Sequence, residues 1–292
     1  MRHLGVPSSG AADPLSLALA NRLVGNASLQ PALETTLTGA TLRFSLSACV
    51  AVTGAVARCE LNGRRVEQHV ALHVETGDQL SVGSAELGVR SYIAVSGGFE
   101  ADDILGSRST YLTAGFGGFH GRALRDGDRL TIGALATECH EIETPSKYRV
   151  PMMANWSLRA TLSVESDTVA EIAQLFDARF TIGRRSDRMG IRLEGATFRT
   201  TASAEMHSVP VFPGTLQCPQ DGSPYLLCVD SGTTGGYPRI AKIARMDMHL
   251  LGQLRPGNRL SLIKRDVQQA AKELRQKQDY FRPWIGDIDD VI

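Results

Sequence analysis

The chain has 292 residues and carries 31 basic and 31 acidic side chains, so its formal net charge is zero. A balanced charge argues against a nucleic-acid surface and against electrostatic docking on a membrane. A hydrophobic share of 42% and a charged share of 21% are ordinary for a globular protein with one large domain or two modest ones.

The start of the chain, MRHLGVPSSG, lacks the apolar core of a signal peptide, and no window reaches the apolar length that a membrane helix needs. The sequence therefore predicts a cytoplasmic protein. The cysteines are odd in number and have no CxxC spacing, so we expect buried, reduced thiols rather than a disulfide frame. They are Cys49, Cys59, Cys139, Cys218 and Cys228.

The first predicted helix begins after Asp13, with Pro14 at its first position, and ends at Gly25. Its apolar face comprises Leu15, Ala18, Leu19 and Leu23. The preceding turn, residues 8–10, has the residue types that can hold an anion at a helix N-terminus. Because Asp13 already satisfies the cap, a plain helix start is the preferred interpretation.

Most of the remaining chain has β character, with short apolar runs separated by Gly, Asp and Asn. One small unit occurs three times, as GDQLSV (77–82), GDRLTI (127–132) and GNRLSL (257–262). Each is a turn that enters an alternating segment, so each predicts a strand. The polar segment 138–151 contains two prolines and separates two β-rich halves, which predicts two lobes, 1–145 and 146–292.

Two more helices are predicted in the second half. One begins near Thr168, where Glu171 completes a capping-box pattern, and its buried stripe would be Val169, Ile172, Ala173 and Phe176. The other runs from about Asp266 to Tyr280, with an apolar face of Val267, Ala270, Ala271 and Leu274 and with charged outer faces. That pattern predicts a helix on the surface.

The string SDRMGIRLEG (186–195) places a hydroxyl, a carboxylate and a guanidinium side by side in a turn. Asp187 could orient or deprotonate a water or a substrate amide, and Arg188 could bind a carboxylate or phosphoryl oxygen; Ser186 would contribute to substrate binding. The alternative is structural, since a local Asp–Arg pair also caps a β-turn.

The string TTGGYP (233–238) is the second candidate. The hydroxyls of Thr233 and Thr234 and the backbone N–H groups of Gly235 and Gly236 could cradle an anion or a developing oxyanion, with Tyr237 beside them. We expect the glycine pair to supply backbone at positive φ and to let another group approach closely. The alternative is a tight glycine turn covered by Tyr237.

A third candidate is Arg108, in the segment LGSRSTY (105–111), which could bind an anionic group. The following TAGFGGFHG lacks the ending of a P-loop and the spacing of a dinucleotide fingerprint, so nucleotide binding is rejected. A structural loop or a contact surface for another chain is the preferred interpretation. No metal site is predicted, because a metal ion at His69 and His73 would need a third ligand and the sequence pattern does not identify one.

Long strings of this chain resemble one family, variously called the C subunit of 5-oxoprolinase, allophanate hydrolase subunit 2 or the biotin-dependent carboxyltransferase domain. The strings are GVPSSGAADPLSLALANRLVGN (5–26), ALETT (32–36), residues 88–128, SDRMGIRLEG, and TTGGYPRIAKIARMDMHLLGQLRPGN (233–258). The resemblance implies two cyclophilin-like β-barrel lobes with a few peripheral helices, which agrees with the β character. It also implies a functional role for the SDRMG turn.

The function implied by the resemblance is that of one component of an ATP-dependent 5-oxoprolinase that opens 5-oxo-L-proline to L-glutamate, together with A-like and B-like subunits as partners. The alternatives are a carboxyltransferase component that moves a carboxyl group from biotin to urea or a similar amide, and a non-enzymatic antagonist that binds a kinase-inhibitor-like protein. Without a biotinylation context or an ATP loop, the chain itself is expected to bind no cofactor, and ATP would be used by the complex.

Two substitutions depart from the family pattern. Gly232 stands where the family usually has Gln before TTGGYP, and Ala12 stands where it has Met. Asp187 follows the family signature, whereas the related urea-type carboxyltransferases have Asn at this position. Relatives also have an extra strand and a Thr-x-Gln-Asp-x-Gly-Arg segment ahead of the point where this sequence begins. The isolated chain is expected to be inactive.

Overall fold

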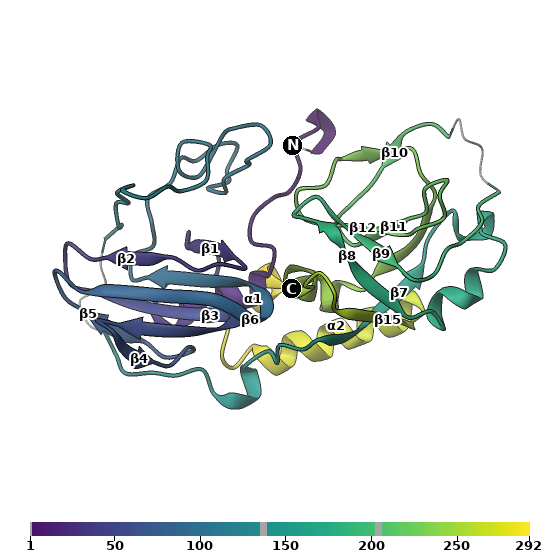
Figure 1. The fold of residues 1–292 in the computed structure, drawn as a ribbon. Coiled ribbons are helices and arrows are strands. Elements are labelled where there is room, and N and C mark those ends of the chain that lie inside the picture. The colour runs from purple at the N-terminus through teal and green to yellow at the C-terminus, as the bar shows by residue number, and fades with distance from the viewer. Residues whose placement is uncertain (1, 135–138, 202–205) are drawn as a thin grey trace. The chain divides into compact units, whose positions relative to one another are not determined.

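The structure is a computed structural model that describes residues 2–134, 139–201 and 206–292. It is mainly β with few helices, as the sequence predicted (Figure 1). None of the described helices is long and apolar enough to cross a membrane.

Contacts divide the chain into two compact units. The N-terminal unit comprises residues 13–153 and 278–292, and the C-terminal unit comprises residues 1–12 and 154–277. Each unit therefore includes a short segment from the opposite end of the chain, an exchange that the hydrophobic pattern did not predict. The predicted boundary between residues 145 and 146 stays a prediction.

The N-terminal unit is built on two long antiparallel strands, β3 (Ala48–Leu61) and β6 (Gln79–Val95). The sheet order is β1-β6-β3-β4, with β2 also on β6 and β5 also on β3. The shorter strands are β1 (Leu33–Thr36), β2 (Thr41–Arg43), β4 (Arg64–Val66) and β5 (Leu72–Val74). Val50, Val52 and Ile93 are almost fully buried between the strands.

The β3–β6 ladder changes register next to Gly54. Gly54 has a φ of +96°, and a Cβ there would lie 2.4 Å from the carbonyl oxygen of Arg90, so only glycine allows the strands to approach here. The described strands of this unit form a six-stranded sheet, and no closed ring of strands is found among them. The predicted barrel is therefore found in one unit only, and its cyclophilin-like character stays a prediction.

The first helix, α1 (Pro14–Leu23), forms as predicted. The Asp13 carboxylate accepts a hydrogen bond from the backbone N–H of Ser16 at 3.0 Å, and Gly25 follows at a φ of +75°. Leu15 and Leu19 pack in an apolar cluster with Tyr148, Phe281, Ile285 and Ile288. This cluster joins α1 to α3 (Ile288–Val291). Two short 3₁₀ turns, η1 (Arg2–Leu4) and η2 (Ser146–Tyr148), precede the barrel strands in the sequence.

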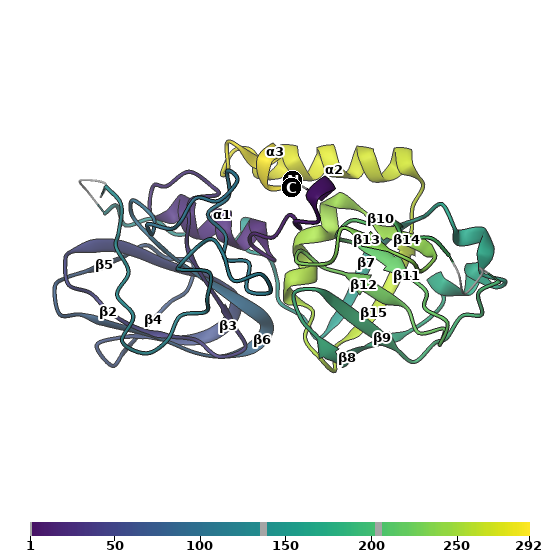
Figure 2. The same ribbon diagram turned by 90° about the horizontal axis from the view of Figure 1, so that it is seen from above.

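The C-terminal unit is a closed seven-stranded barrel with the order β11-β12-β9-β8-β15-β7-β14 (Figures 1 and 2). Its strands are β7 (Asn155–Leu162), β8 (Phe180–Ser186), β9 (Gly190–Glu194), β11 (Thr215–Gln217), β12 (Tyr225–Leu227), β14 (Arg239–Ile243) and β15 (Arg259–Lys264). Only β15 and β7 pair in parallel. The interior is filled by buried side chains such as Leu158, Phe180 and Leu193.

Two of the three repeated turns enter strands as predicted: Gly77 and Gly257 have positive φ and precede β6 and β15. The third prediction was wrong. Gly127 does turn at a φ of +87°, but residues 129–132 form only one isolated bridge, between Ile132 and Phe99. Without a neighbouring strand to pair with, a polar turn and an alternating pattern are not sufficient for a ladder.

The helix predicted from Thr168 is absent from the structure. Residues 166–176 form two 3₁₀ turns, η3 (Ser166–Thr168) and η4 (Ile172–Phe176), and Val169 bridges Thr200 instead. Competing hydrogen bonds explain the difference, because the Thr168 hydroxyl donates to the carbonyl oxygen of Glu165 and Glu171 makes no side-chain cap. Val169 is buried as predicted, but Phe176 is not, and Leu175 is buried in its place.

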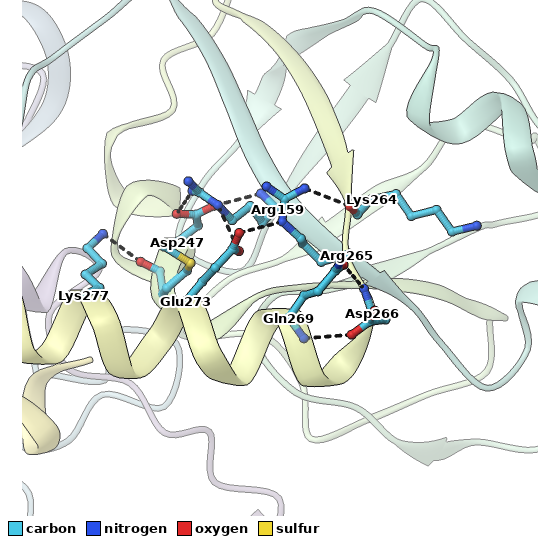
Figure 3. A network of polar contacts seen from close by, with 9 residues as sticks. Arg159, Asp247, Lys264, Arg265, Asp266, Gln269, Glu273 and Lys277 are labelled. Carbon is cyan, nitrogen blue, oxygen red and sulfur yellow. Dashed lines mark hydrogen bonds and ion pairs between the residues drawn. The ribbon is translucent and has the colours of Figure 1, made fainter.

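The last helix, α2 (Val267–Phe281), forms as predicted, but ion pairs hold it to the barrel. Glu273 lies between Arg265 of the β15–α2 connection, at 2.8 Å, and Arg159 of β7, at 3.2 Å (Figure 3). Arg159 also pairs with the buried Asp247 at 3.1 Å, on η5 (Arg245–Gln253). Val267 was predicted on the buried face, yet it is 74% exposed, because the contact at this end of α2 is polar.

The cysteine prediction was wrong in one respect, since Cys49 and Cys139 form a disulfide with Cα atoms 5.2 Å apart. Cys49 opens β3, where it pairs with β5, and the segment just after Cys139 bridges back to the start of β5 through Val70 and Glu143. These long-range pairings place the two thiols together, which no sequence spacing reveals. Cys59, Cys218 and Cys228 form no disulfide and are buried, as predicted.

Candidate functional site

The turn between β8 and β9 contains the SDRMG residues. Asp187 Oδ1 accepts hydrogen bonds from the backbone N–H groups of Met189 at 2.7 Å and Gly190 at 3.1 Å. The Asp187 side chain therefore caps the turn, which was the structural alternative. Its second oxygen, Oδ2, has no hydrogen-bond partner among the described residues, and the residue is exposed. One carboxylate oxygen is thus available to a substrate or a water.

Ser186 contributes to the same turn by donating from its hydroxyl to the carbonyl oxygen of Gly183 at 2.7 Å. Gly190 allows a close packing of Tyr225 on the neighbouring strand, because a Cβ at position 190 would lie 2.3 Å from the tyrosine ring. Burial raises the pKa of Tyr225, and the negative charge of Asp187 raises it further. Tyr225 therefore stays a neutral hydrogen-bonding group close to the exposed carboxylate.

Arg188 points back into the protein. Its Nε donates to Asp230 Oδ2 at 2.6 Å, and its Nη2 donates to Asp230 Oδ1 at 3.1 Å and to the carbonyl oxygen of Gly10 at 2.6 Å. The side chain of Asp230 is only 7% exposed and that of Arg188 is 21% exposed. Asp230 thus neutralises the guanidinium and fixes its orientation. Direct anion binding by Arg188 stays a prediction.

Backbone pairing brings the residues that precede TTGGYP to the β8–β9 turn. Because Leu227 of β12 pairs with Gly190 of β9, the chain after β12 runs along the β8–β9 turn. Cys228 N–H donates to the carbonyl oxygen of Met189 at 3.0 Å, and Asp230 N–H donates to that of Arg188 at 2.9 Å. Three residues later the chain reaches Thr233, the start of TTGGYP.

The N-terminal segment completes this region. Ser9 N–H donates to the carbonyl oxygen of Val229 at 3.1 Å, next to the contact between Gly10 and Arg188. We call the group Ser9, Gly10, Asp187, Arg188 and Asp230 the barrel-end cluster. The hydroxyl oxygens of Ser9 and of the adjacent Ser231 are buried without a hydrogen-bond partner among the described residues. Unpaired buried hydroxyls are typical of a site that a ligand or a water completes.

The TTGGYP segment forms a two-stranded ribbon, in which β13 (Thr234–Gly235) pairs with β10 (Val209–Pro210). Val211 N–H donates to the carbonyl oxygen of Thr233 at 3.0 Å. Thr234 is exposed, and Tyr237 is 47% exposed rather than packed over the turn. The exposed hydroxyl and ring are placed where a ligand can reach them, but the predicted anion cradle stays a prediction.

The expectation of positive φ at the glycine pair was wrong, since neither Gly235 nor Gly236 has it. Close packing explains Gly235 instead, because a Cβ there would lie 2.6 Å from Nε2 of Gln217. That amide nitrogen donates to the carbonyl oxygen of Tyr237 at 3.1 Å and so holds the loop. At Gly236 a Cβ would lie 3.2 Å from the carbonyl oxygen of Met206.

Arg108 lies in the N-terminal unit, whereas the other candidate residues lie in the C-terminal unit. Its Nε is 3.9 Å from Asp103 Oδ2, and both side chains are about half exposed. Its participation in one site with Asp187 therefore stays a prediction. The loop around it exposes Leu105 and Leu112 by 54% and 52%, which favours the contact-surface interpretation.

Among residues 2–134, 139–201 and 206–292, no group of His, Cys, Asp and Glu has the geometry of a metal site. His69 makes a contact of 3.4 Å with the Thr144 hydroxyl. Burial and the nearby charge of Arg149 lower the pKa of His69 to about 4, so its ring is neutral at pH 7.

Sequence reasoning missed Asp230 and the role of residues 9–10. A signal for Asp230 was present, because an acid in the apolar run YLLCVDSG (225–232) needs a buried partner. That partner lies on a different hairpin and could not be named from the pattern. The role of Gly10 depends on a contact between residues far apart in the sequence.

The closed barrel, with an exposed carboxylate on a capped turn beside a polar loop, is the framework of a small-molecule site on a β protein. Residues 4–264 match the family model of the carboxyltransferase domain, subdomain A and B. The chain therefore belongs to the carboxyltransferase domain family, as the motifs of its sequence indicated.

Two named relatives and one solved structure show which members of this family the chain is similar to. The chain is similar to the C subunit of 5-oxoprolinase from Escherichia coli (strain K12), with 35% identity over 282 residues, which cover 96% of this chain and 90% of that protein. It is also similar to the C subunit of 5-oxoprolinase from Haemophilus influenzae, with 35% identity over 292 residues, 99% of this chain and 93% of that protein. Among solved structures it resembles Kluyveromyces lactis urea carboxylase, with a TM-score of 0.90 and 29% identity, over 97% of this chain but 27% of that one.

Proposed function

We propose that this chain is one component of a 5-oxoprolinase complex that hydrolyses 5-oxo-L-proline to L-glutamate with consumption of ATP. The observation that carries the proposal is the near full-length similarity to two proteins named as the C subunit of 5-oxoprolinase. Because those names describe one of several subunits, they support partner chains, which we propose to be the A-like and B-like subunits. A cytoplasmic location is part of the same proposal.

The chemistry required is the opening of an unactivated lactam. Transfer of a phosphoryl group from ATP to the lactam oxygen, with release of ADP, would activate the ring carbon. Water would add to that carbon, and the C–N bond would then break with a proton moving to the ring nitrogen, which leaves an acyl phosphate. A second water would hydrolyse the acyl phosphate to L-glutamate and phosphate. The chain has no glycine-rich ATP loop of its own, so we propose that a partner chain supplies the nucleotide site. This chain is proposed to bind no cofactor of its own.

Asp187 is the residue best placed to act on the substrate. Two backbone N–H groups hold one of its oxygens and leave the other exposed. The carboxylate is therefore fixed in orientation and still has one oxygen available to accept hydrogen bonds. It would position the attacking water or accept a hydrogen bond from the ring N–H. Ser186, Thr233, Thr234 and Tyr237 would line the substrate site, and the N–H groups of Gly235 and Gly236 would stabilise developing negative charge.

A carboxyltransferase reaction on urea or a similar amide is the second candidate, because the fold matches K. lactis urea carboxylase over nearly the whole chain. In that case biotin would be carried by another domain or chain. Asp187 distinguishes the two candidates, since the urea-type carboxyltransferases have Asn at this position. A binding protein without catalytic activity is the third outcome to be tested.

The test is co-expression of the chain with its neighbouring subunits, followed by an assay of ATP-dependent glutamate release from 5-oxo-L-proline. We expect release to need all subunits and to fall about a hundredfold or more in Asp187→Ala. Asp221→Ala is the matched control, because Asp221 is also an exposed barrel acid but pairs with Arg192. Biotin-dependent carboxylation of urea without glutamate release would establish the second candidate, and a stable complex with neither activity the third.

A further inference from the structure

Two basic residues of the C-terminal unit lie at the ring of Phe212. The guanidinium carbon of Arg2 is 4.7 Å from the ring centroid, and the amine nitrogen of Lys242 is 5.8 Å from the same centroid. Lys242 lies on β14, five residues after Tyr237, and Arg2 lies on the N-terminal segment. Two positive groups at one ring are unusual, because like charges in proximity disfavour each other.

Neither cation has an acidic partner among the described residues. Arg2 Nη2 donates to the carbonyl oxygen of Val211, and Lys242 Nζ donates to that of Pro213. A protonated amine has three N–H donors, so one carbonyl leaves donors of Lys242 unused. Phe212 itself is 52% exposed, so solvent and small solutes reach the ring that both cations contact.

Electrostatics agree with this geometry. Burial, and to a smaller extent the charge of Arg2, lower the pKa of Lys242 to about 8. Burial also lowers the pKa of Arg2. A negatively charged ligand between the two groups would remove the repulsion and supply the missing hydrogen-bond acceptors.

The location connects this region to the candidate site. Val211, which accepts from Arg2, donates its own N–H to the carbonyl oxygen of Thr233. The same N-terminal segment that contains Arg2 reaches Arg188 through Gly10. A chain of contacts therefore links the two cations to the loops that contain Arg188 and Thr233.

We propose that Arg2 and Lys242 form an oxyanion-binding site for a carboxylate or phosphoryl group, beside the ring of Phe212. Binding of such an anion is a property of this chain and does not depend on the reaction assigned to the complex. Where the proposed function holds, the same site would receive the carboxylate of 5-oxo-L-proline or a phosphoryl group derived from ATP.

The experiment follows the side-chain signals of the full chain by NMR after labelling of lysine with carbon-13. The chain has only five lysines, Lys147, Lys242, Lys264, Lys272 and Lys277, so single substitutions assign every signal. Inorganic phosphate is the phosphoryl probe, 5-oxo-L-proline is the carboxylate probe, and 2-pyrrolidinone is the same lactam without a carboxylate.

We expect a saturable shift of the Lys242 signal with phosphate, with 5-oxo-L-proline or with both, and none with 2-pyrrolidinone. The bound anion should raise the midpoint of the Lys242 titration by about one pH unit, which corresponds to tenfold tighter anion binding to the protonated amine. Which probe binds tells the phosphoryl source from the carboxylate source. Binding of 2-pyrrolidinone at the same place, or no saturable shift with either anion, overturns the proposal.

In isothermal titration calorimetry, which does not need the Lys242 signal, Lys242→Met should weaken anion binding about tenfold to a hundredfold, because a charge-assisted hydrogen bond is lost. Lys264→Met is the matched control, since the Lys264 amine is also 5.8 Å from a phenylalanine ring, that of Phe176, in the same unit. Arg2→Gln tests the second cation if Lys242→Met does not fold. If the Lys242 or Arg2 variant binds the anion with the same affinity as the control Lys264→Met, the proposal is wrong. This outcome does not depend on whether the complex hydrolyses 5-oxo-L-proline.

Discussion

Replacement of Asp230 by alanine should destabilise the C-terminal unit, because it leaves the inward-facing guanidinium of Arg188 without its counter-charge. The Asp230 side chain is 7% exposed and makes two hydrogen bonds with Arg188. Breaking a buried ion pair from one side costs about 3–5 kcal/mol. Because 21% of the Arg188 side chain is in contact with solvent, we expect the lower end, about 3 kcal/mol.

The assays are urea unfolding and thermal unfolding, both followed by tryptophan fluorescence. The chain has two tryptophans, the buried Trp156 in the barrel and Trp284 in the N-terminal unit, so Trp284→Phe leaves a reporter for the barrel alone. A separate reporter matters because a chain of two units need not unfold in one step. In this background Asp230→Ala should lower the midpoint of thermal unfolding by about 9 °C, from about 3 °C per kcal/mol for a unit of this size.

Asp221→Ala is the comparison that decides the result. Asp221 and Arg192 are 2.7 Å apart in the same barrel, yet their side chains are 50% and 41% exposed. An exposed pair of this kind contributes about 0.5 kcal/mol. If Asp230→Ala costs no more than Asp221→Ala, the account of the barrel-end cluster is refuted. Adding Arg188→Met to Asp230→Ala should recover part of the loss, because the unpaired charge is then removed.

Three further predictions concern other parts of the fold. The pKa of His69 lies at about 4 in the folded state, below its unfolded value, so stability should be lost as the pH falls from 6.5 to 4, and His69→Asn should flatten that loss in an acid unfolding series. Reduction of the Cys49–Cys139 disulfide should lower the stability of the N-terminal unit by about 3 kcal/mol, and a peptide map that finds both thiols free would contradict the pairing. Gly190→Ala should cost about 2 kcal/mol in denaturant unfolding through overpacking, whereas Gly232→Ala, with its nearest atom at 3.4 Å, should be neutral.

The local features of the fold could be predicted from the sequence, and the long-range ones could not. Asp13 and Pro14 fixed the start of α1 because a cap and a first-turn proline act within four residues. The segment after Thr168 has a similar signal but no helix, because its hydroxyl and Val169 bond to partners outside the segment. Local patterns hold where no distant partner competes for the same groups.

The same distinction applies to the candidate site. The strings around Asp187 and Thr233 were recognisable as polar loops, and strand pairing places the residues just before Thr233, 227–230, against the Asp187 turn. The partner of Arg188 was not predictable, because Asp230 and Gly10 reach it only through barrel closure and the return of residues 1–12. At the glycine pair the expected close approach of another group is confirmed at Gly235, which packs against Gln217, whereas the expected positive φ is not found.

The exchange of chain segments has a consequence for synthesis on the ribosome. Residues 1–12 belong to the C-terminal unit, so they leave the exit tunnel long before the barrel that they join is complete at residue 277. The N-terminal unit in turn waits for residues 278–292, which contribute Phe281, Ile285 and Ile288 to its apolar cluster. Neither unit can finish folding before residue 277 has been synthesised. The chain therefore cannot fold one unit after the other during synthesis. Its nascent form exposes unfinished apolar surfaces for longer than two consecutive domains would, and a cut at residue 153 would give two incomplete fragments that need each other.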